Sequence, residues 1–295
     1  MARMVQRGEP YGDVRTLRCV SFALGKALCH LGLLTVRRSC RTKKGQHTVV
    51  ELKLVSWNIR AGLGRDFRRR PLRTIDTISA FDADVVVLQE ADFRMHPRPA
   101  ALPSAHGRVG PFEVVDLTPT GVGLGWHGIA VLKRPGIQVD AIYRYDLPAL
   151  EPRGAVVVDL TLSGKQVRIV GVHLGLLRGN RRKQIAFIAE QLLKFDRRPV
   201  IIAGDYNEWR DRFGFETMPA WLHVHSPGPS FPAGRPILHL DRLAFSNEFE
   251  LLESGVIGDR HAAMASDHRP VRALFHLLEG KGAGLQKTTP NGAKG

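Results

Sequence analysis

Cysteine is nearly absent from this 295-residue chain, and none occurs after residue 40. The three cysteines, Cys19, Cys29 and Cys40, all lie in the first fifty residues. A disulfide framework or a cysteine-ligated zinc site therefore cannot hold the rest of the chain together. Such a composition suits a reducing compartment, and we expect a cytoplasmic protein.

The N-terminal region lacks an apolar run long enough to predict a membrane span. Its most apolar stretch, Cys19 to Leu34, is short and is interrupted by Lys26 and His30. A basic start before an apolar run is typical of a signal peptide, but five Lys or Arg residues follow where a small-residue cleavage site would stand. We predict that residues 1–50 form a basic, poorly ordered extension. Peripheral membrane association through an amphipathic surface segment is the alternative.

Acidic residues are too few to balance the basic ones, and the formal net charge is +15. The excess lies mainly at the ends. Residues 1–50 contain ten Lys or Arg against two Asp or Glu, and residues 280–295 contain three lysines and no acid. Residues 51–279 therefore contain thirty basic and twenty-six acidic residues. This modest excess argues against broad, nonspecific duplex binding by the body of the protein. The composition of residues 280–295 predicts a disordered tail.

Strand and helix signals alternate through the body of the chain. The spacing predicts one helix over 71–81, with a proline at its start, and a longer one over 178–195, with an apolar face of Ile185, Ile188, Ala189 and Leu192. Apolar runs typical of strands occupy 49–57, 85–88, 112–117, 127–132, 137–145, 155–162, 166–173, 200–203, 239–245, 249–256 and 271–277. Because so many strands exceed a simple doubly wound sheet, we predict two packed sheets with helices outside.

One apolar run ends in a pattern that suggests a functional site. Val200 to Ala203 stops at Gly204, where the chain can turn sharply, and Asp205 and Asn207 follow. Residues two apart point the same way in an extended chain, so the carboxylate and the amide are expected side by side. Such a pair suits a hard cation or a phosphate, although Gly, Asp and Asn also favour ordinary turns.

Similar polar side chains accompany five further apolar runs. They are acid, amide or imidazole groups: Asn58, Glu90, His173, Asp241, and Asp267 with His268. Strand ends that meet at one edge of a layered α/β fold are where sites form. Because the pattern recurs six times in one chain, we predict that these residues assemble a single site.

The motifs resemble those of the endonuclease/exonuclease/phosphatase superfamily. They follow the family's order and cover about residues 52–277: Ser56-Trp57-Asn58-Ile59, Leu88-Gln89-Glu90, Val172-His173-Leu174, Gly204-Asp205-Tyr206-Asn207, Leu240-Asp241-Arg242 and Ser266-Asp267-His268-Arg269-Pro270. The resemblance implies a family domain over residues 51–279. It also implies a four-layer α/β sandwich of the deoxyribonuclease I type, with two packed mixed β-sheets flanked by helices.

The resemblance also implies roles for individual residues. Glu90 is expected to be the main metal ligand, helped by Asn58 and Asp267, and this oxygen set suits Mg²⁺, with Mn²⁺ as the alternative. The expected catalytic residues are His173, Asp205, Asn207, Asp241 and His268. Asp205 would orient or deprotonate the attacking water, and Asn207 would hold that water or a phosphoryl oxygen. His268, held by Asp241, would contact the phosphate or transfer a proton.

Some residues carry weaker expectations. A histidine at position 173 resembles the deoxyribonuclease-like and sphingomyelinase-like branches, whereas abasic-site endonucleases usually have tyrosine there. His127 is a weak candidate for touching substrate, and Trp209 is expected to pack beside the site. Two arginine-rich stretches, 65–73 and 178–183, are predicted to form a cationic rim, with Arg60 and Arg178 reaching the substrate.

The sequence therefore predicts a monomeric, divalent-metal-dependent phosphoric ester hydrolase without an obligate protein partner, and specifically a phosphodiesterase. Three anionic substrates compete. The arginine-rich stretches favour a nucleic acid, His173 and the N-terminal segment favour a phospholipid headgroup, and compact loops favour a small phosphodiester. A noncatalytic relative that binds nucleic acid or membranes is the alternative, but the complete set of polar residues argues against it.

Overall fold

The computed structural model describes residues 50–95, 97–118, 121–149, 151–210 and 214–278. The chain divides between Gln46 and His47 into two units, and every described residue belongs to the second. The predicted N-terminal extension, apart from Val50, and the predicted tail lie outside the described residues. Among the residues that are described, no helix is both long and apolar enough to cross a membrane.

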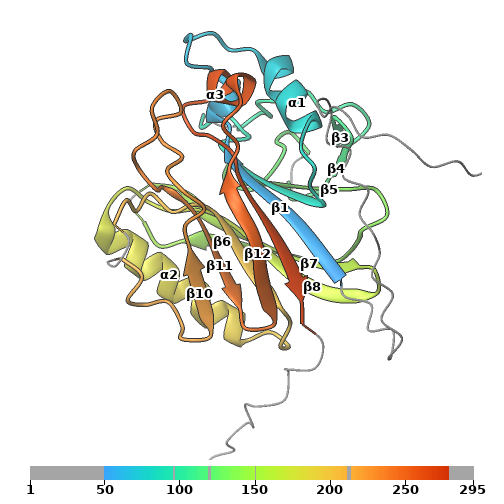
Figure 1. Cartoon of the computed structure of the whole chain (residues 1–295), viewed down its shortest axis with the longest axis vertical. Coiled ribbons are helices and arrows are strands. Elements are labelled where there is room, and N and C mark those ends of the chain that lie inside the picture. Colours follow the sequence, from blue (N-terminus) through green and yellow to red (C-terminus); the bar gives the residue numbers. More distant parts are fainter. Residues whose placement is uncertain (1–49, 96, 119–120, 150, 211–213, 279–295) are drawn as a thin grey trace, which may run out of the picture. The chain divides into compact units, whose positions relative to one another are not determined.

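Two mixed β-sheets form the centre of the second unit (Figure 1). The seven-stranded sheet has the order β12-β13-β1-β2-β5-β4-β3. Its strands are β1 (Val50–Asn58), β2 (Val85–Gln89), β3 (Arg108–Val109), β4 (Phe112–Val114), β5 (Ala130–Lys133), β12 (Phe249–Val256) and β13 (Val271–Leu277). The six-stranded sheet has the order β10-β11-β9-β8-β7-β6. Its strands are β6 (Gln138–Leu147), β7 (Arg153–Leu162), β8 (Lys165–His173), β9 (Val200–Asp205), β10 (Leu222–His225) and β11 (Asp241–Ser246).

Helices cover the outer face of each sheet and complete four layers. They are α1 (Pro71–Ser79), α2 (Arg178–Leu193) and α3 (Arg260–Ala265), and a short 3-10 turn, η1 (Arg60–Gly62), follows β1. Alternate residues of β2 show the layering: Val85 and Val87 belong to the core between the sheets, whereas Val86 and Leu88 pack in the core shared with α1 and α3. The run of four apolar residues, Val85 to Leu88, is explained by this burial on both faces.

The predicted apolar face of the long helix is confirmed. Ile185, Ile188 and Leu192 of α2 are buried in a third core against the outer face of the six-stranded sheet, and Ala189 is buried as well. Burying one such aliphatic side chain contributes about 1.5–3 kcal/mol relative to leaving it in water. Packing of this face therefore fixes α2 along the strands that end at the site.

Each sheet contains one parallel strand pair among the described strands, and these pairs position the polar strand ends. β1 pairs in parallel with β2, with Asn58 opposite Gln89. β8 pairs in parallel with β9, with His173 opposite Asp205, and the antiparallel strand β11 begins at Asp241 beside Asp205. The predicted site residues therefore lie at the carboxyl ends of two parallel pairs and at the start of their antiparallel neighbours.

The structure corrects several predicted elements. The strand predicted from residue 127 begins at Ala130, because residues 126–129 form a tight turn with His127 at a positive φ of 50°. The strand predicted over 112–117 ends at Val114, and β3 lies outside the predicted strands. Strand β10 and helix α3 were not predicted: β10 contains two histidines in four residues, and α3 is only six residues long.

Candidate functional site

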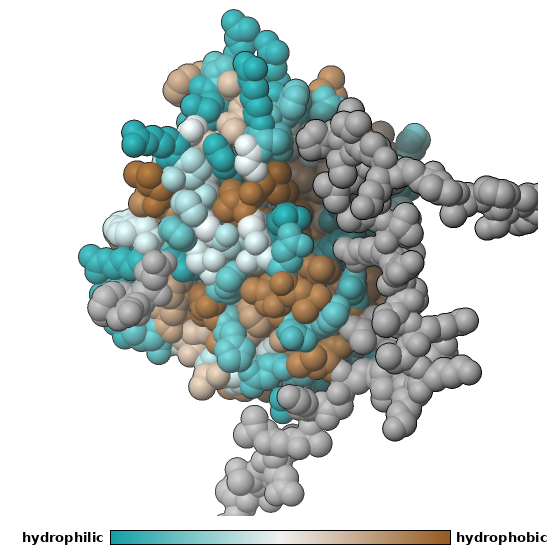
Figure 2. Space-filling view, viewed as in Figure 1, coloured by the Kyte–Doolittle hydropathy of each residue, from teal (hydrophilic) through white to brown (hydrophobic). Residues whose placement is uncertain are grey.

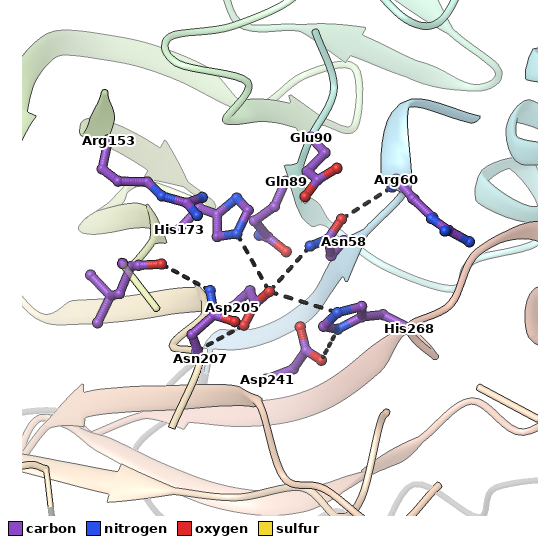
Figure 3. A network of polar contacts seen from close by, with 12 residues as sticks. Asn58, Arg60, Gln89, Glu90, Arg153, His173, Asp205, Asn207, Asp241 and His268 are labelled. Atoms are coloured by element: carbon purple, nitrogen blue, oxygen red, sulfur yellow. Dashed lines mark hydrogen bonds and ion pairs between the residues drawn. The ribbon is translucent and has the colours of Figure 1, made fainter. Parts of the chain in front are cut away.

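The Asp205 carboxylate is the centre of the site (Figure 3). It is 1% exposed and lies at the end of β9. The Asn58 amide donates to its Oδ2 at 3.1 Å, and the Nε2 atoms of His173 and His268 lie 3.5 and 3.7 Å from the same oxygen. The Asn207 backbone N–H donates to Oδ1 at 2.9 Å. Both sheets therefore converge on one carboxylate.

His268 is oriented by a buried aspartate. Its Nδ1 lies 2.8 Å from Asp241 Oδ2, and the Ser230 hydroxyl donates to the same oxygen. The Phe231 ring packs against the imidazole with 4.9 Å between ring centroids, and the Trp57 indole N–H donates to the His268 carbonyl at 2.9 Å. An imidazole held at Nδ1 by a carboxylate presents Nε2 to the site in a fixed direction.

Burial and neighbouring charges set the protonation of the site. Burial raises the pKa of Asp205 to about 6, against the opposing effect of His268. For His268, burial opposes protonation, but the nearby carboxylates of Asp241 and Asp205 outweigh it and raise the pKa to about 10. Burial, together with the nearby positive charge of Arg153, lowers the pKa of His173 well below its usual range. At neutral pH the site therefore pairs a cationic imidazole with a neutral one on either side of a largely ionised carboxylate.

The backbone on either side of Asp205 restricts which residue types fit at positions 204 and 207. Gly204 lies against the backbone of Val172, and a Cβ there would overlap the Val172 carbonyl. Asn207 adopts a positive φ of 51°, and its side-chain amide donates to the Leu174 carbonyl at 2.9 Å. The Gly-Asp-x-Asn pattern thus provides both a close strand approach and a left-handed residue that asparagine tolerates.

The segment after Asn207 is held by buried charges. Glu208 forms a buried ion pair with Arg181 of α2, with 2.5 Å between Oε2 and Nη2. The Arg242 guanidinium donates to the Glu208 carbonyl at 3.2 Å. Arg181, predicted to lie in a cationic rim, is therefore a buried structural residue. Arg73, predicted for the same rim, instead pairs with Asp66 at 2.9 Å. Arg65, Arg68, Arg69 and Arg70 of the predicted rim are exposed.

The predicted metal ligands lie on the seven-stranded side of the site. Glu90 follows β2 at a positive φ of 53°, and one of its oxygens accepts from Arg94 at 2.9 Å. Figure 3 shows its carboxylate on the same side of the network as the Asn58 amide. Asp267 pairs with Arg60 at 3.2 Å, and Asn58 Oδ1 accepts from the Arg60 backbone N–H at 3.1 Å. The two ion pairs involve partly exposed side chains, so they can open without disturbing the core, whereas Asn58 is only 3% exposed.

The donor chemistry fits a hard divalent cation. Glu90 and Asn58 offer a carboxylate and an amide oxygen at neighbouring strand ends, and Asp267 adds a second carboxylate near Arg60. No cluster of three or more His, Cys, Asp or Glu side chains able to bind a metal occurs among the described residues. A cation held here would have few protein ligands, which suits Mg²⁺ because it keeps several waters.

A pocket opens beside Glu90 and His173. It contains about 520 Å³ of empty space, part of it open to solvent, and Arg98, His127 and Arg153 also line it. His127 contacts Arg98 through Nδ1 at 3.0 Å and Asp146 through Nε2 at 2.6 Å. The weakly predicted His127 therefore lies in the wall of the pocket.

Sequence analysis missed Arg153, which lies next to His173 (Figure 3). It is 8% exposed, pairs with Glu151 at 2.9 Å, and its buried Nε has no hydrogen-bond partner among the described residues. Arg153 begins β7, which runs antiparallel to β8, so the first residue of β7 lies at the same edge as the last residue of β8. The sequence feature that could have identified Arg153 is an arginine two residues before the apolar run 155–162.

Three further predicted residues lie apart from the Asp205 network. Arg178 pairs with Glu216, with 2.5 Å between Nη2 and Oε1, and the Arg60 side chain extends away from Asp205 toward Asp267. The Arg60 guanidinium also lies 5.8 Å from the centroid of the Phe67 ring. Trp209, expected to pack beside the site, is instead 53% exposed. The prediction was wrong because Trp209 lies in an exposed segment just beyond the buried Glu208.

Comparisons with known proteins agree with these motifs. Residues 55–268 match the sequence profile described as Endonuclease/Exonuclease/phosphatase family. The chain is 31% identical over 164 residues to the uncharacterized protein YbhP of Escherichia coli. That match covers 52% of this chain and 64% of YbhP, so it spans less than two thirds of the relative.

Solved structures with the same fold include three from distant relatives. A family protein from Bacteroides thetaiotaomicron has a TM-score of 0.62 at 17% identity, covering 78% of this chain and 99% of its own. D. rerio TDP2 complexed with a single strand DNA product has a TM-score of 0.61 at 16% identity, covering 76% and 98%. A B. thetaiotaomicron mannosyl-6-phosphatase has a TM-score of 0.59 at 17% identity, covering 76% and 99%. At these identities the likeness establishes the four-layer sandwich fold alone.

Proposed function

The chain belongs to the endonuclease/exonuclease/phosphatase family, and we propose from that premise that it is a divalent-metal-dependent phosphodiesterase. The observation that carries the proposal is the Asp205 carboxylate, which Asn58, His173 and His268 surround at 3.1–3.7 Å. Oxygen donors for a cation stand directly beside it. Family membership supports hydrolysis of phosphate esters, and this geometry supports the assignment of roles below.

Asp205 is the group that accepts the proton of the attacking water. Its pKa of about 6 leaves it largely ionised at neutral pH yet basic enough to take a proton in the transition state. The water oxygen forms a bond to phosphorus while the ester P–O bond breaks, and the leaving oxygen then takes a proton from solvent. Asn207, anchored to the Leu174 carbonyl, holds the turn that directs Asp205.

The two histidines act on the phosphoryl oxygens. His268 is protonated and donates from Nε2, so it stabilises the negative charge that develops on the phosphoryl group. His173 is neutral and serves as a hydrogen-bonding group without adding charge. Arg153, partly unpaired behind His173, adds positive potential on the pocket side.

Glu90, Asn58 and Asp267 are the residues proposed to hold the cation. A bound Mg²⁺ would neutralise phosphate charge and stabilise the leaving oxygen. A cation can bind to both carboxylates only when the Arg94–Glu90 and Arg60–Asp267 ion pairs open. Arg94 is 74% exposed in its side chain, so its ion pair with Glu90 is weak, on the order of 0–1 kcal/mol.

The substrate is not fixed by the fold. Neighbours of this fold include a mannosyl-6-phosphatase and a protein bound to a single strand DNA product, so one scaffold serves different phosphate esters. We propose a diester over a monoester, a monomeric enzyme, and no obligate protein partner. A binding protein without turnover is disfavoured, because every polar residue of the predicted set is present.

One panel of assays tests the proposal. The full chain is incubated with Mg²⁺, Mn²⁺ or EDTA and bis-p-nitrophenyl phosphate, p-nitrophenyl phosphate, DNA, RNA or phospholipid vesicles, beside Asp205→Ala. We expect EDTA-sensitive turnover of at least one diester, lost in the variant. Absence of such turnover on every substrate would favour the binding protein, and activity retained by Asp205→Ala would refute the assigned mechanism.

A further inference from the structure

Exposed apolar side chains gather on the loops around the site. Eight large apolar side chains among the described residues are more than half exposed, and six of them lie on loops next to the site residues. These six define the site rim and are between 53% and 81% exposed: Phe67, Met95, Leu176, Leu177, Trp209 and Ile237. The other two, Leu72 and Leu193, lie on α1 and at the end of α2.

The fold explains why these residues share one end of the sheets. Phe67 and Met95 follow β1 and β2, Leu176 and Leu177 follow β8, and Trp209 follows β9. Ile237 precedes β11, whose first residue lies opposite the last residue of β9. Every rim residue is therefore within ten residues of a strand terminus that carries a site residue.

Contacts between the loops join them around the site. The Arg69 guanidinium lies 4.6 Å from the centroid of the Phe93 ring, which links the loop of Phe67 to the loop of Met95. On the other side, the Arg65 guanidinium lies against Gly234, in the loop of Ile237. The loops of Phe67, Met95 and Ile237 therefore adjoin one another, and Arg181 joins the loop of Leu176 to the segment of Trp209 by contacting the Leu176 carbonyl and Glu208.

The loop of Phe67 is strongly cationic. Residues 59–70 contain five arginines and one aspartate, and Arg65, Arg68, Arg69 and Arg70 are exposed. Figure 2 shows one face of the molecule, on which hydrophobic residues alternate with hydrophilic ones instead of forming one continuous apolar area. Apolar side chains interspersed with arginines suit an interface that is anionic at its surface and apolar just below it.

We propose that the site rim docks on an anionic phospholipid bilayer and that the substrate is a phospholipid phosphodiester at that surface. The rim then lies at the level of the headgroups while the site faces the scissile phosphate. A single-stranded nucleic acid would use aromatic rings for base stacking. Only two of the six rim residues, Phe67 and Trp209, are aromatic, which favours lipid. The substrate half of this inference rests on the proposed phosphodiesterase function, whereas the docking half does not.

The test separates docking from turnover. The Asp205→Asn variant of the full chain is floated with phosphatidylcholine vesicles or with vesicles that also contain the anionic lipid phosphatidylglycerol. The rim variant is Leu176→Ser/Leu177→Ser, and the matched control is Leu193→Ser at the opposite end of α2. All of them keep the basic residues 1–50, so a difference between them reports on the rim.

We expect binding to the anionic vesicles only, reduced at least about tenfold in the rim variant and unchanged in the control. With Asp205 restored, the ratio of vesicle-lipid turnover to bis-p-nitrophenyl phosphate turnover should fall by a similar factor in the rim variant alone. Equal vesicle binding by rim variant and control, or no vesicle binding at all, would overturn the docking.

The remaining outcomes are also decisive. Turnover of bis-p-nitrophenyl phosphate without vesicle binding would overturn this inference and leave the proposed function intact. Vesicle binding without turnover of any ester would overturn the proposed function and the lipid substrate but leave the docking. Single-stranded DNA that binds tightly and competes with vesicles only while the rim is intact would reassign the rim to nucleic acid.

Discussion

The two parallel strand pairs end in polar clusters of different character. At the end of β8 and β9, His173 and Asp205 are 5% and 1% exposed, and buried hydrogen bonds fix Asp205 and His268. At the end of β1 and β2, the Glu90 side chain is 22% exposed and its partner is the 74% exposed Arg94. The first cluster is preorganised, whereas the second can exchange partners. This difference suits fixed proton-handling groups beside a position that a cation enters and leaves.

The largest expected effect comes from the preorganised cluster. Asp205→Asn keeps the shape but cannot accept a proton, so kcat on bis-p-nitrophenyl phosphate should fall about a thousandfold. Because burial already disfavours the Asp205 charge, the neutral variant should remain folded, which thermal melting checks. Added Mg²⁺ should not restore the rate. A fall of less than tenfold would remove Asp205 from the chemistry.

The second prediction concerns the buried ion pair that holds the segment after Asn207. Arg181→Met leaves Glu208 as an uncompensated buried charge and should lower the free energy of unfolding by about 3–5 kcal/mol. Arg178→Met, three residues earlier on α2, removes an exposed pair and should cost about 0–1 kcal/mol. Urea titrations compare the two variants, and equal losses would contradict the buried role of Arg181.

The third prediction addresses the exchangeable cluster. Glu90→Gln removes a charge from the proposed cation site, so the Mg²⁺ concentration for half-maximal rate should rise at least about tenfold. Saturating Mg²⁺ should recover much of kcat, in contrast to Asp205→Asn. Metal titrations of turnover distinguish the two clusters. Equal rescue of both variants by excess Mg²⁺ would contradict the assignment of Asp205 to proton transfer and of Glu90 to cation binding.

The smallest expected effect has the opposite sign. Arg60 pairs with Asp267 and competes with a cation for that carboxylate. Arg60→Gln should therefore lower the half-maximal Mg²⁺ concentration by about two- to fivefold, as expected for a partly exposed ion pair. If Arg60 instead binds the substrate, as the sequence suggested, KM would rise and the Mg²⁺ requirement would stay unchanged.

Sequence reasoning reached most of the site because the relevant residues end apolar strands. Asn58, His173 and Asp205 are the last residues of β1, β8 and β9, and the structure brings all three together. Prediction from the sequence failed at residues whose environment depends on distant partners. Arg181 and Arg178 look equivalent in the sequence. In the structure, Arg181 forms a buried ion pair with Glu208, whereas Arg178 forms a partly exposed ion pair with Glu216.

Local periodicity and residue type are enough to predict the alternating strands, the long helix, the family and the kinds of residue that gather at the site. The oxygen that the two imidazoles share, the position of Arg153 behind His173, and the arginines that remain at the surface become visible in the folded chain alone. The physical reason is that pKa values, ion pairing and exposure depend on neighbours in space. Asp205 and Asn58 are 147 residues apart in the chain and 3.1 Å apart in the fold.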